Sequence, residues 1–327
     1  MSGTSPIDSA EGRDQSEPRP LRAMSGEPAA MGQSPPQIIA PAELSESDPG
    51  LHRRLKRNAK GEVTLFGRRV SLETDDYGRR PVLGQPAAGE KTLAVYGCSF
   101  TYGNPLPFED TFCSVLQSFF PSWRVENHGV GAFGGMQNLI QLRRNSRWSR
   151  ADYVTFCFID DHRLRNVADI SWLRRITRNP PSGAKPRPFP RAAIARDGGL
   201  ALRYAMHPRW DLDGIDVSDF RHDDYYLDLV AALIFERAAE IVRANGGHFF
   251  LTVLRGQLSP LLRARLEQSR IPIVNASVQG REYTCLPEDP HPNALAHRHF
   301  AERIRDYLIE AEVAPRLATS PPQPTSA

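Results

Sequence analysis

The sequence has few cysteines, little net charge and no long apolar run. Four cysteines occur among 327 residues, and 41 basic residues against 38 acidic ones leave a net charge of +3. Widely separated cysteines do not suggest a disulfide framework or a zinc site, and the charge balance does not favour a nucleic-acid partner. With no apolar run long enough to span a bilayer and no apolar core of a signal peptide at the N-terminus, we expect no membrane span and a cytoplasmic location.

The two ends of the chain differ in composition from its middle. Residues 1–48 are rich in Pro, Ser, Gly, Glu and Ala without periodicity, which predicts a disordered tail, and residues 315–327 read the same way. Residues 49–90 predict a short β-rich lead-in segment. In it, the apolar runs 63–66 and 70–72 flank Gly67 as a hairpin.

Residues 91–314 predict one domain in which strands and helices alternate. The predicted strands are Thr92–Gly97, Arg124–Asn127, Tyr153–Ile159, His248–Leu254 and Ile271–Asn275. The predicted helices are Thr111–Phe120, Gly135–Trp148, His162–Thr177, Tyr225–Asn245, Pro260–Ser269 and Asn293–Glu312. Apolar strands separated by amphipathic helices indicate an α/β fold with a parallel sheet that is covered on both faces.

An insertion at residues 179–222 interrupts this alternation. It is rich in Pro and Arg, and two short runs around Asp197-Gly198-Gly199 predict a hairpin. A loop of this length inside a domain is often functional. A substrate-specifying lid and a solvated elaboration are both compatible with the sequence.

Two junctions between a strand and a helix carry reactive side chains. Ser99 follows the apolar strand 92–97, and His291 stands two residues after Asp289 near the start of the last helix. A serine becomes a nucleophile when a base takes its proton and a third group orients that base. Because the carboxyl ends of parallel strands share one edge of the sheet, we expect these residues to converge there.

Three sequence blocks together resemble the SGNH (GDSL) hydrolase family. Gly97-Cys98-Ser99-Phe100-Thr101 is similar to its first block, Asn127-His128-Gly129-Val130-Gly131-Ala132 to its second, and Asp289-Pro290-His291-Pro292-Asn293 to its last. The resemblance implies a three-layer α/β/α sandwich with a flavodoxin-like parallel sheet. It also implies a serine-dependent ester hydrolase or acyltransferase that needs no cofactor or metal and acts on an acylated carbohydrate, lipid or small metabolite.

The resemblance assigns a role to each site residue. Ser99 is the implied nucleophile and His291 the base. The acid is Asp289 or Glu288, and we favour Asp289 because its shorter side chain holds the ring more firmly. The backbone N–H groups of Ser99 and Ala132, the latter after Gly131, are the implied oxyanion donors. Cys98 replaces the usual aspartate, and we interpret it as a buried apolar residue.

The third block departs from the family pattern. Asp160 stands where the family has an asparagine that donates to the oxyanion, and the loss of such a donor costs roughly 3–4 kcal/mol in the transition state. His162 or Arg163 are candidate replacements, as is a protonated Asp160, and Arg163 and Arg165 are candidates for binding an anionic substrate. The alternative is a weak or inactive protein of this fold that binds a carbohydrate or a partner protein. The carboxylates and imidazoles near Asp160 match no metal-site spacing, and the oligomeric state stays open.

Overall fold

The computed structural model describes residues 42–147, 150–177, 188–206 and 222–319. The predicted disorder of residues 1–41 and 320–327 lies outside these ranges, as do the parts 179–187 and 207–221 of the predicted insertion. Within the described ranges, none of the helices combines the length and the apolar character that crossing a bilayer requires.

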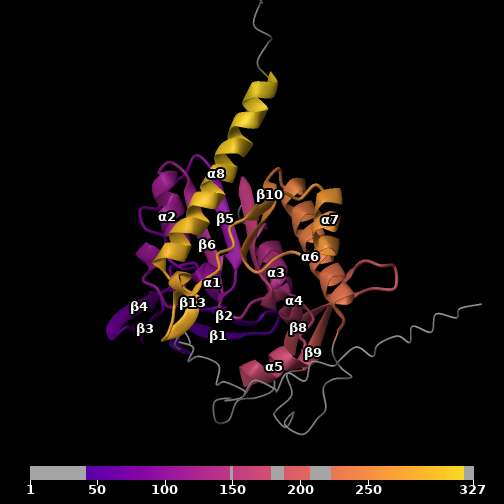
Figure 1. The fold of residues 1–327 in the computed structure, drawn as a ribbon, viewed down its shortest axis with the longest axis horizontal. Helices are drawn as coiled ribbons and strands as arrows, with labels where there is room; N and C mark the ends of the chain where they lie inside the picture. The colour runs from indigo at the N-terminus through magenta and orange to yellow at the C-terminus, as the bar shows by residue number, and fades with distance from the viewer. Residues whose placement is uncertain (1–41, 148–149, 178–187, 207–221, 320–327) are drawn as a thin grey trace, which may run out of the picture. The chain divides into compact units, whose positions relative to one another are not determined.

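The central sheet is parallel, as predicted (Figure 1). Its strands are β5 (Thr92–Gly97), β6 (Arg124–Gly129), β7 (Tyr153–Ile159), β10 (His248–Arg255) and β11 (Ile273–Asn275). They lie in the order β6-β5-β7-β10-β11. Counted along the chain this order is 2-1-3-4-5, which is the flavodoxin-like arrangement, so the predicted fold class is confirmed.

Helices cover both faces of this sheet. On β5, Leu93 and Val95 face one apolar cluster, whereas Ala94 and Tyr96 face the other, because successive strand residues point to opposite sides. The first cluster is closed by α2 (Phe112–Phe119) and α8 (Ala294–Thr319). The second is closed by α3 (Gly135–Asn145), α6 (Asp224–Ala244) and α7 (Pro260–Gln268). In Figure 1, α8 accordingly lies beside α2, and α7 beside α6.

The described chain begins inside the region predicted as a tail. A short 3₁₀ helix (Ala42–Leu44) leads into β1 (Ser45–Asp48), which pairs antiparallel with β2 (His52–Leu55). Leu44 is fully buried. Asp48 forms an ion pair with Arg144 of α3 at 2.8 Å. The predicted boundary at residue 48 was therefore wrong, because a single buried leucine and one long-range ion pair leave no periodic pattern in the sequence.

The predicted hairpin in the lead-in segment is confirmed. β3 (Lys60–Leu65) pairs antiparallel with β4 (Arg68–Glu73) through a turn at Phe66 and Gly67, whose φ angles are 48° and 70°. Two positive φ angles match the right-handed twist of the two strands. The inner face of this hairpin packs against Tyr102 and Leu106, in the segment that follows Ser99.

Two predicted helix boundaries were wrong. The single helix predicted at 162–177 is two helices, α4 (Asp161–Asn166) and α5 (Ile170–Thr177), because Ala168 between them has φ = 52°. A left-handed residue ends a helix. At the C-terminus, α8 continues to Thr319 and thus through the first five residues of the predicted tail.

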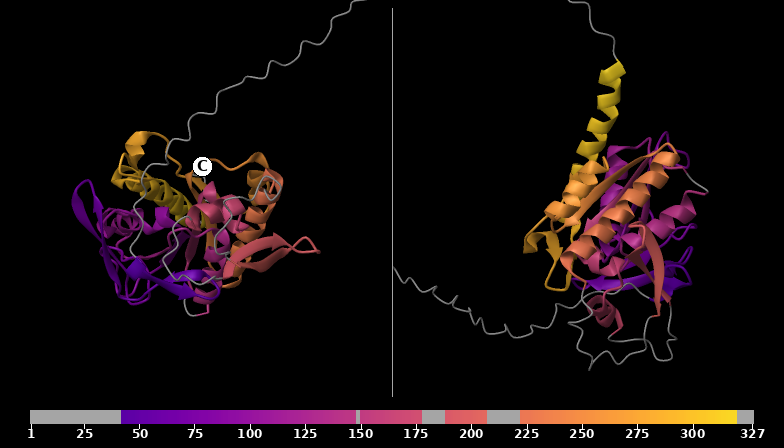
Figure 2. Two further views of the ribbon diagram at one scale, coloured as in Figure 1. Left: turned by 90° about the horizontal axis from the view of Figure 1, so that it is seen from below. Right: turned by 90° about the vertical axis from the view of Figure 1, so that its right-hand side faces the viewer.

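The hairpin predicted in the insertion is confirmed around Asp197-Gly198-Gly199. It consists of β8 (Pro188–Ile194) and β9 (Leu200–Met206). Phe189 of β8 is buried against Trp172 of α5, with ring centroids 4.8 Å apart. Figures 1 and 2 show this hairpin, α5 and the β1–β2 hairpin at the same end of the central sheet.

Candidate active site

Ser99 is the first residue of α1 (Ser99–Tyr102), directly after β5 and the residue Cys98. The backbone reverses sharply here, since the amides of Thr101 and Tyr102 both donate to the Cys98 carbonyl, at 3.0 and 2.9 Å. The Cys98 side chain is 1% exposed and belongs to the apolar cluster under α2 and α8. The turn therefore buries its cysteine and leaves Ser99 half-buried at the end of the strand.

Two paired glycines make room for this turn. Gly97 of β5 lies opposite Gly129 of β6. A Cβ on Gly97 would lie 2.0 Å from Thr101 Oγ1, and one on Gly129 would lie 2.3 Å from the Tyr102 backbone nitrogen. Both distances are far below van der Waals contact, so α1 packs across these strand ends only because neither residue has a side chain.

Asn127 connects the serine turn to the second sequence block. Its amide nitrogen donates to the Thr101 carbonyl at 2.9 Å, and its side-chain oxygen accepts from the Gly129 amide at 3.0 Å. Because Asn127 is buried, both bonds form away from competing water. This residue sets the position of α1 relative to the loop that follows β6.

His291 lies on β13 (Asp289–Pro292), which pairs with β12 (Thr284–Cys285). Its Nε2 lies 2.8 Å from Ser99 Oγ, and its Nδ1 lies 2.6 Å from Asp289 Oδ1. The same carboxylate oxygen accepts from the His291 backbone amide at 2.7 Å. Asp289 is 0% exposed and His291 is 3% exposed. The structure thus brings serine, imidazole and carboxylate into one continuous chain of contacts.

Glu288, the other candidate acid, points elsewhere. Its carboxylate accepts a hydrogen bond from the backbone amide of Phe66, in the β3–β4 turn. This contact ties the segment before His291 to the lead-in hairpin. Of the two candidate acids, Asp289 is the one in contact with the imidazole.

The loop after β6 forms a β-turn beside Ser99. The Phe133 amide donates to the Val130 carbonyl at 3.1 Å, which leaves Gly131 and Ala132 at the corner. Ala132 has φ = 64°, a left-handed conformation that costs an alanine about 1 kcal/mol or more. A Cβ built on Gly131 would lie 3.9 Å from Ser99 Cβ, so this corner directly borders the serine. The alanine adopts the conformation that a glycine would adopt without strain.

Asp160, the residue in place of the family's asparagine, contacts the loop after β10. Both of its carboxylate oxygens lie 1.9 Å from the position that a Cβ would occupy on Gly256. Burial raises the pKa of Asp160, and Asp161 adds to this rise, while Arg255 and the Gln257 backbone amide oppose it. The carboxylate therefore occupies the space beside Gly256, a glycine with φ = 79°.

Two side chains were candidates to replace the missing amide donor. His162 is buried, and Arg163 forms ion pairs. His162 is 1% exposed and lies edge-on against the Phe158 ring at 6.0 Å. Burial, together with the charge of Arg165, places its pKa well below the usual value, so it is neutral. Arg163 forms ion pairs with Asp228 at 2.7 Å and with Asp224 at 2.8 Å, both on α6. The contacts of both side chains thus lie on elements other than the serine turn.

Two arginines that the sequence did not place at the site contact the loop beside Ser99. Arg53 of β2 donates through Nη2 to the Gly131 carbonyl. Arg165 of α4 donates through Nη1 to the Phe133 carbonyl at 3.1 Å. The sequence suggests Arg165 as a substrate-binding cation and not as a partner of this loop. Arg53 lies 78 residues before Gly131. No short-range pattern in the sequence points to the contact made by Arg53.

A small apolar pocket of about 40 Å³ lies between Phe100 and the segments around β13. Its lining includes Leu254, Pro290 and Phe300, with Arg255 as its charged member. The Arg255 guanidinium lies 5.0 Å from the Phe100 ring centroid and forms an ion pair with Asp161. Phe100 and Pro290 directly neighbour Ser99 and His291 in the chain. In the described ranges, no three His, Cys, Asp or Glu side chains gather as a metal site would require.

No protein-family model matches this sequence, and no curated protein matches it either. Solved structures with a similar fold include a member of the lipolytic G-D-S-L family from Veillonella parvula, 11% identical, with 67% of this chain and 98% of that chain covered and a TM-score of 0.40. A psychrotrophic esterase from Pseudoalteromonas sp. is 10% identical, with 68% and 99% covered and a TM-score of 0.40. A two-domain esterase active on acetylated mannans is 14% identical, with 68% of this chain and 50% of that chain covered and a TM-score of 0.40.

Proposed function

We propose that the protein is a serine-dependent ester hydrolase or acyltransferase that works through a covalent acyl-enzyme. The observation that carries this proposal is the chain of contacts from Ser99 Oγ to His291 Nε2 (2.8 Å) and from His291 Nδ1 to Asp289 (2.6 Å). Both distances lie within hydrogen-bond reach, and the base is oriented by a buried carboxylate, as an activated nucleophile requires.

In the proposed reaction, Ser99 Oγ attacks the acyl carbonyl while His291 Nε2 takes the serine proton. The carbonyl π pair moves onto oxygen, and the backbone N–H groups of Ser99 and Ala132 bind the resulting oxyanion. Collapse of this intermediate expels the alcohol, which receives the proton from His291, and leaves the acyl group on Ser99. Water or an acceptor hydroxyl then attacks the acyl group on Ser99 while His291 takes its proton. Collapse of the second intermediate releases Ser99, which receives this proton from His291. Asp289 holds the tautomer of the imidazole throughout.

The substrate of this reaction is proposed at the level of class. An acylated carbohydrate, lipid or small metabolite contains the ester that the proposed nucleophile needs. Hydrolysis and acyl transfer use the same residues and differ in whether water reaches the acyl-enzyme.

The first experiment is intact-mass measurement after exposure to a fluorophosphonate, with Ser99→Ala and His291→Ala in parallel. The serine oxygen forms a bond to phosphorus, fluoride leaves, and the serine proton passes to His291. We expect one adduct on the wild-type protein and none on either variant. Folded wild-type protein without an adduct would contradict the proposal.

The position of Asp160 favours a second candidate, a catalytically weak protein of this fold that binds a carbohydrate or a partner protein. An ionised carboxylate cannot donate to an oxyanion. Asp160→Asn restores the amide, and the damaged-hydrolase interpretation then expects faster labelling of Ser99. An unchanged rate would mean that the missing amide does not limit this site.

A further inference from the structure

The loop that borders Ser99 is held by two guanidinium groups from separate parts of the chain. Arg53 donates to the Gly131 carbonyl, and Arg165 donates to the Phe133 carbonyl. Both carbonyls belong to the turn that contains the left-handed Ala132. A backbone turn in a strained conformation persists only when its surroundings hold it there.

The peptide between Gly131 and Ala132 connects Arg53 to the proposed oxyanion donor. This peptide is trans, since the cis bonds of the described chain lie elsewhere. In a planar trans peptide, the C=O of Gly131 and the N–H of Ala132 point in opposite directions. A donor on the Gly131 carbonyl oxygen therefore does not compete with an acceptor at the Ala132 N–H, and it polarises that N–H toward a stronger hydrogen bond.

The positive charge of Arg53 also favours an oxyanion beside Ser99. Within the described ranges no carboxylate forms an ion pair with its guanidinium, and the charge that acts on it is that of Arg165. Burial lowers the pKa of Arg53 to about 10, with Arg165 contributing, so the guanidinium stays protonated at neutral pH. A Cβ on Gly131 would lie 3.3 Å from Arg53 Nη2 and 3.9 Å from Ser99 Cβ. Arg53 and Ser99 therefore both border Gly131, and a cation in this position stabilises the negative charge that develops on an oxyanion beside the serine.

The β1–β2 hairpin places Arg53 at this point. Asp48 closes the hairpin turn by accepting from the amides of Gly50 and Leu51, both at 2.8 Å, and pairs with Arg144 of α3. Leu51 is buried in the cluster beneath α3 and α6. The hairpin is therefore fixed to α3, the helix that follows the loop beside Ser99, and this holds Arg53 next to the Gly131 carbonyl.

We infer that Arg53 is a positioning residue for the proposed reaction. It fixes the Gly131–Ala132 peptide, polarises the Ala132 N–H and supplies positive charge, in place of the amide donor that Asp160 does not provide. This inference rests on the proposed function and adds to it a residue from outside the three sequence blocks.

The test compares the fluorophosphonate labelling kinetics of wild type, Arg53→Gln and Arg53→Lys. Glutamine keeps a donor for the Gly131 carbonyl but removes the charge, and lysine keeps the charge. We expect Arg53→Gln to lower the maximal labelling rate by about ten- to a hundredfold, less than the loss of a direct oxyanion donor, with the apparent inhibition constant unchanged. Arg53→Lys should recover most of this loss.

The matched control is Arg54→Gln on the same strand. Arg54 is exposed and pairs with Glu46 at 2.7 Å, so its loss should leave labelling unchanged. Far-UV circular dichroism and thermal unfolding show whether each variant is folded. Should Arg53→Gln fail to fold, Arg53→Met, which keeps the length of the side chain without its charge, replaces it, and an unchanged maximal rate in that variant would contradict a positioning role.

Three results would overturn the inference. Equal rates for wild type and Arg53→Gln would show that the guanidinium does not act on the reaction. A loss confined to the affinity for a carboxylate-bearing fluorophosphonate would show that Arg53 binds a substrate anion instead. No labelling of the wild type would overturn the proposed function, and this inference with it, whereas the first two results leave the proposed function intact.

Discussion

Two buried pairs of carboxylate and imidazole occur in this molecule with the same spacing. Asp289 and His291 are two residues apart on β13, and Glu126 and His128 are two residues apart on β6. In the first pair the carboxylate lies 2.6 Å from the ring, and in the second 3.0 Å. Of these two pairs, it is the first that reaches a serine. The spacing thus produces the pair, and the surroundings decide what it does.

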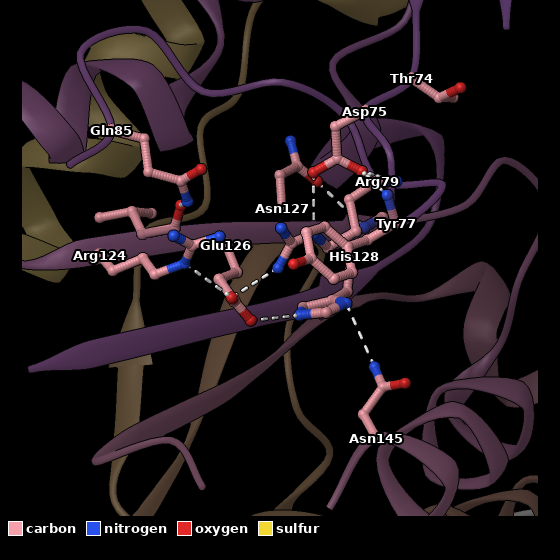
Figure 3. A network of polar contacts seen from close by, with 12 residues as sticks. Thr74, Asp75, Tyr77, Arg79, Gln85, Arg124, Glu126, Asn127, His128 and Asn145 are labelled. Atoms are coloured by element: carbon pink, nitrogen blue, oxygen red, sulfur yellow. Dashed lines mark hydrogen bonds and ion pairs between the residues drawn. The ribbon is translucent and has the colours of Figure 1, made fainter. Parts of the chain in front are cut away.

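The second pair belongs to a network of charges on β6 (Figure 3). Glu126 is shared among His128, Arg79 at 2.5 Å and Arg124 at 3.1 Å. The other ring nitrogen of His128 faces the Asn145 amide at 3.3 Å. Burial would raise the pKa of Glu126, but hydrogen bonds and charges from His128 and Arg79 outweigh it and lower the pKa well below the usual value. This carboxylate is therefore ionised and held by Arg79, Arg124 and His128, and we interpret the network as structural.

The largest expected difference between the pairs is catalytic. Asp289→Asn should slow fluorophosphonate labelling by about 10⁴-fold, because an amide there stabilises the wrong tautomer of His291. Glu126→Gln, the matched change in the other pair, should leave the labelling rate of the folded protein within about twofold of wild type, a change of less than about 1 kcal/mol. Similar losses in both variants would show that the two pairs are not functionally distinct.

The next difference concerns stability. Glu126→Gln should lower the free energy of unfolding by about 3 kcal/mol, because it leaves Arg79, which is 8% exposed, without one of its buried partners. Asp289→Asn should cost about 1 kcal/mol, since the asparagine oxygen still accepts from the His291 amide. Urea unfolding at pH 7 measures both values. The reverse order of stability would contradict the structural assignment of the Glu126 network.

The stability difference between wild type and Glu126→Gln should depend on pH. The folded pKa of Glu126 is lowered, so its contribution is complete above the unfolded value of 4.5 and is lost as the pH falls below it, when the unfolded chain takes up the proton first. Unfolding at about pH 7, 5, 4 and 3 should show the difference between the two proteins shrinking below about pH 5. A constant difference would mean that Glu126 does not titrate differently in the two states.

The smallest effect is expected from placing a hydroxyl beside the second imidazole. Asn145→Ser, made in the Ser99→Ala background, gives the Glu126 pair all three residue types of a triad. We expect no fluorophosphonate adduct, because the proposed oxyanion donors are the backbone amides of Ser99 and Ala132. We also expect a loss of stability of about 1 kcal/mol from the amide contacts to His128 and Tyr96. An adduct on the serine introduced by this change would show that the spacing alone suffices.

The regular elements and the two residues Ser99 and His291 were accessible from sequence because their signals are local. The apolar run 92–97 forms β5 as predicted, and the alternating pattern predicted the parallel sheet. The blocks around Ser99 and His291 marked two residues whose side chains lie 2.8 Å apart in the structure. Periodicity and turn residues report on neighbours within a few positions, which is the range over which helices and strands form.

Contacts between distant segments were not accessible in this way. The sequence left Glu288 as a candidate acid, but its carboxylate accepts a hydrogen bond from the Phe66 amide in the β3–β4 turn. It offered Arg163 as a substitute donor, but two aspartates of α6 bind it. The Phe66 partner lies 222 residues from Glu288, and the Asp224 partner lies 61 residues from Arg163 along the chain. No local pattern encodes which of several equivalent charges the folded chain brings into contact.

By itself, the sequence determined an α/β chain with a serine and an imidazole at strand ends, because strand period, helix period and glycine-containing turns are properties of short segments. Only the tertiary structure decided that Asp289 contacts His291, that Asp160 lies against Gly256, and that Arg53 reaches the loop beside Ser99. The physical reason is that a side chain's partner depends on the packing of whole layers, which sets the position of every loop at the end of the sheet at once.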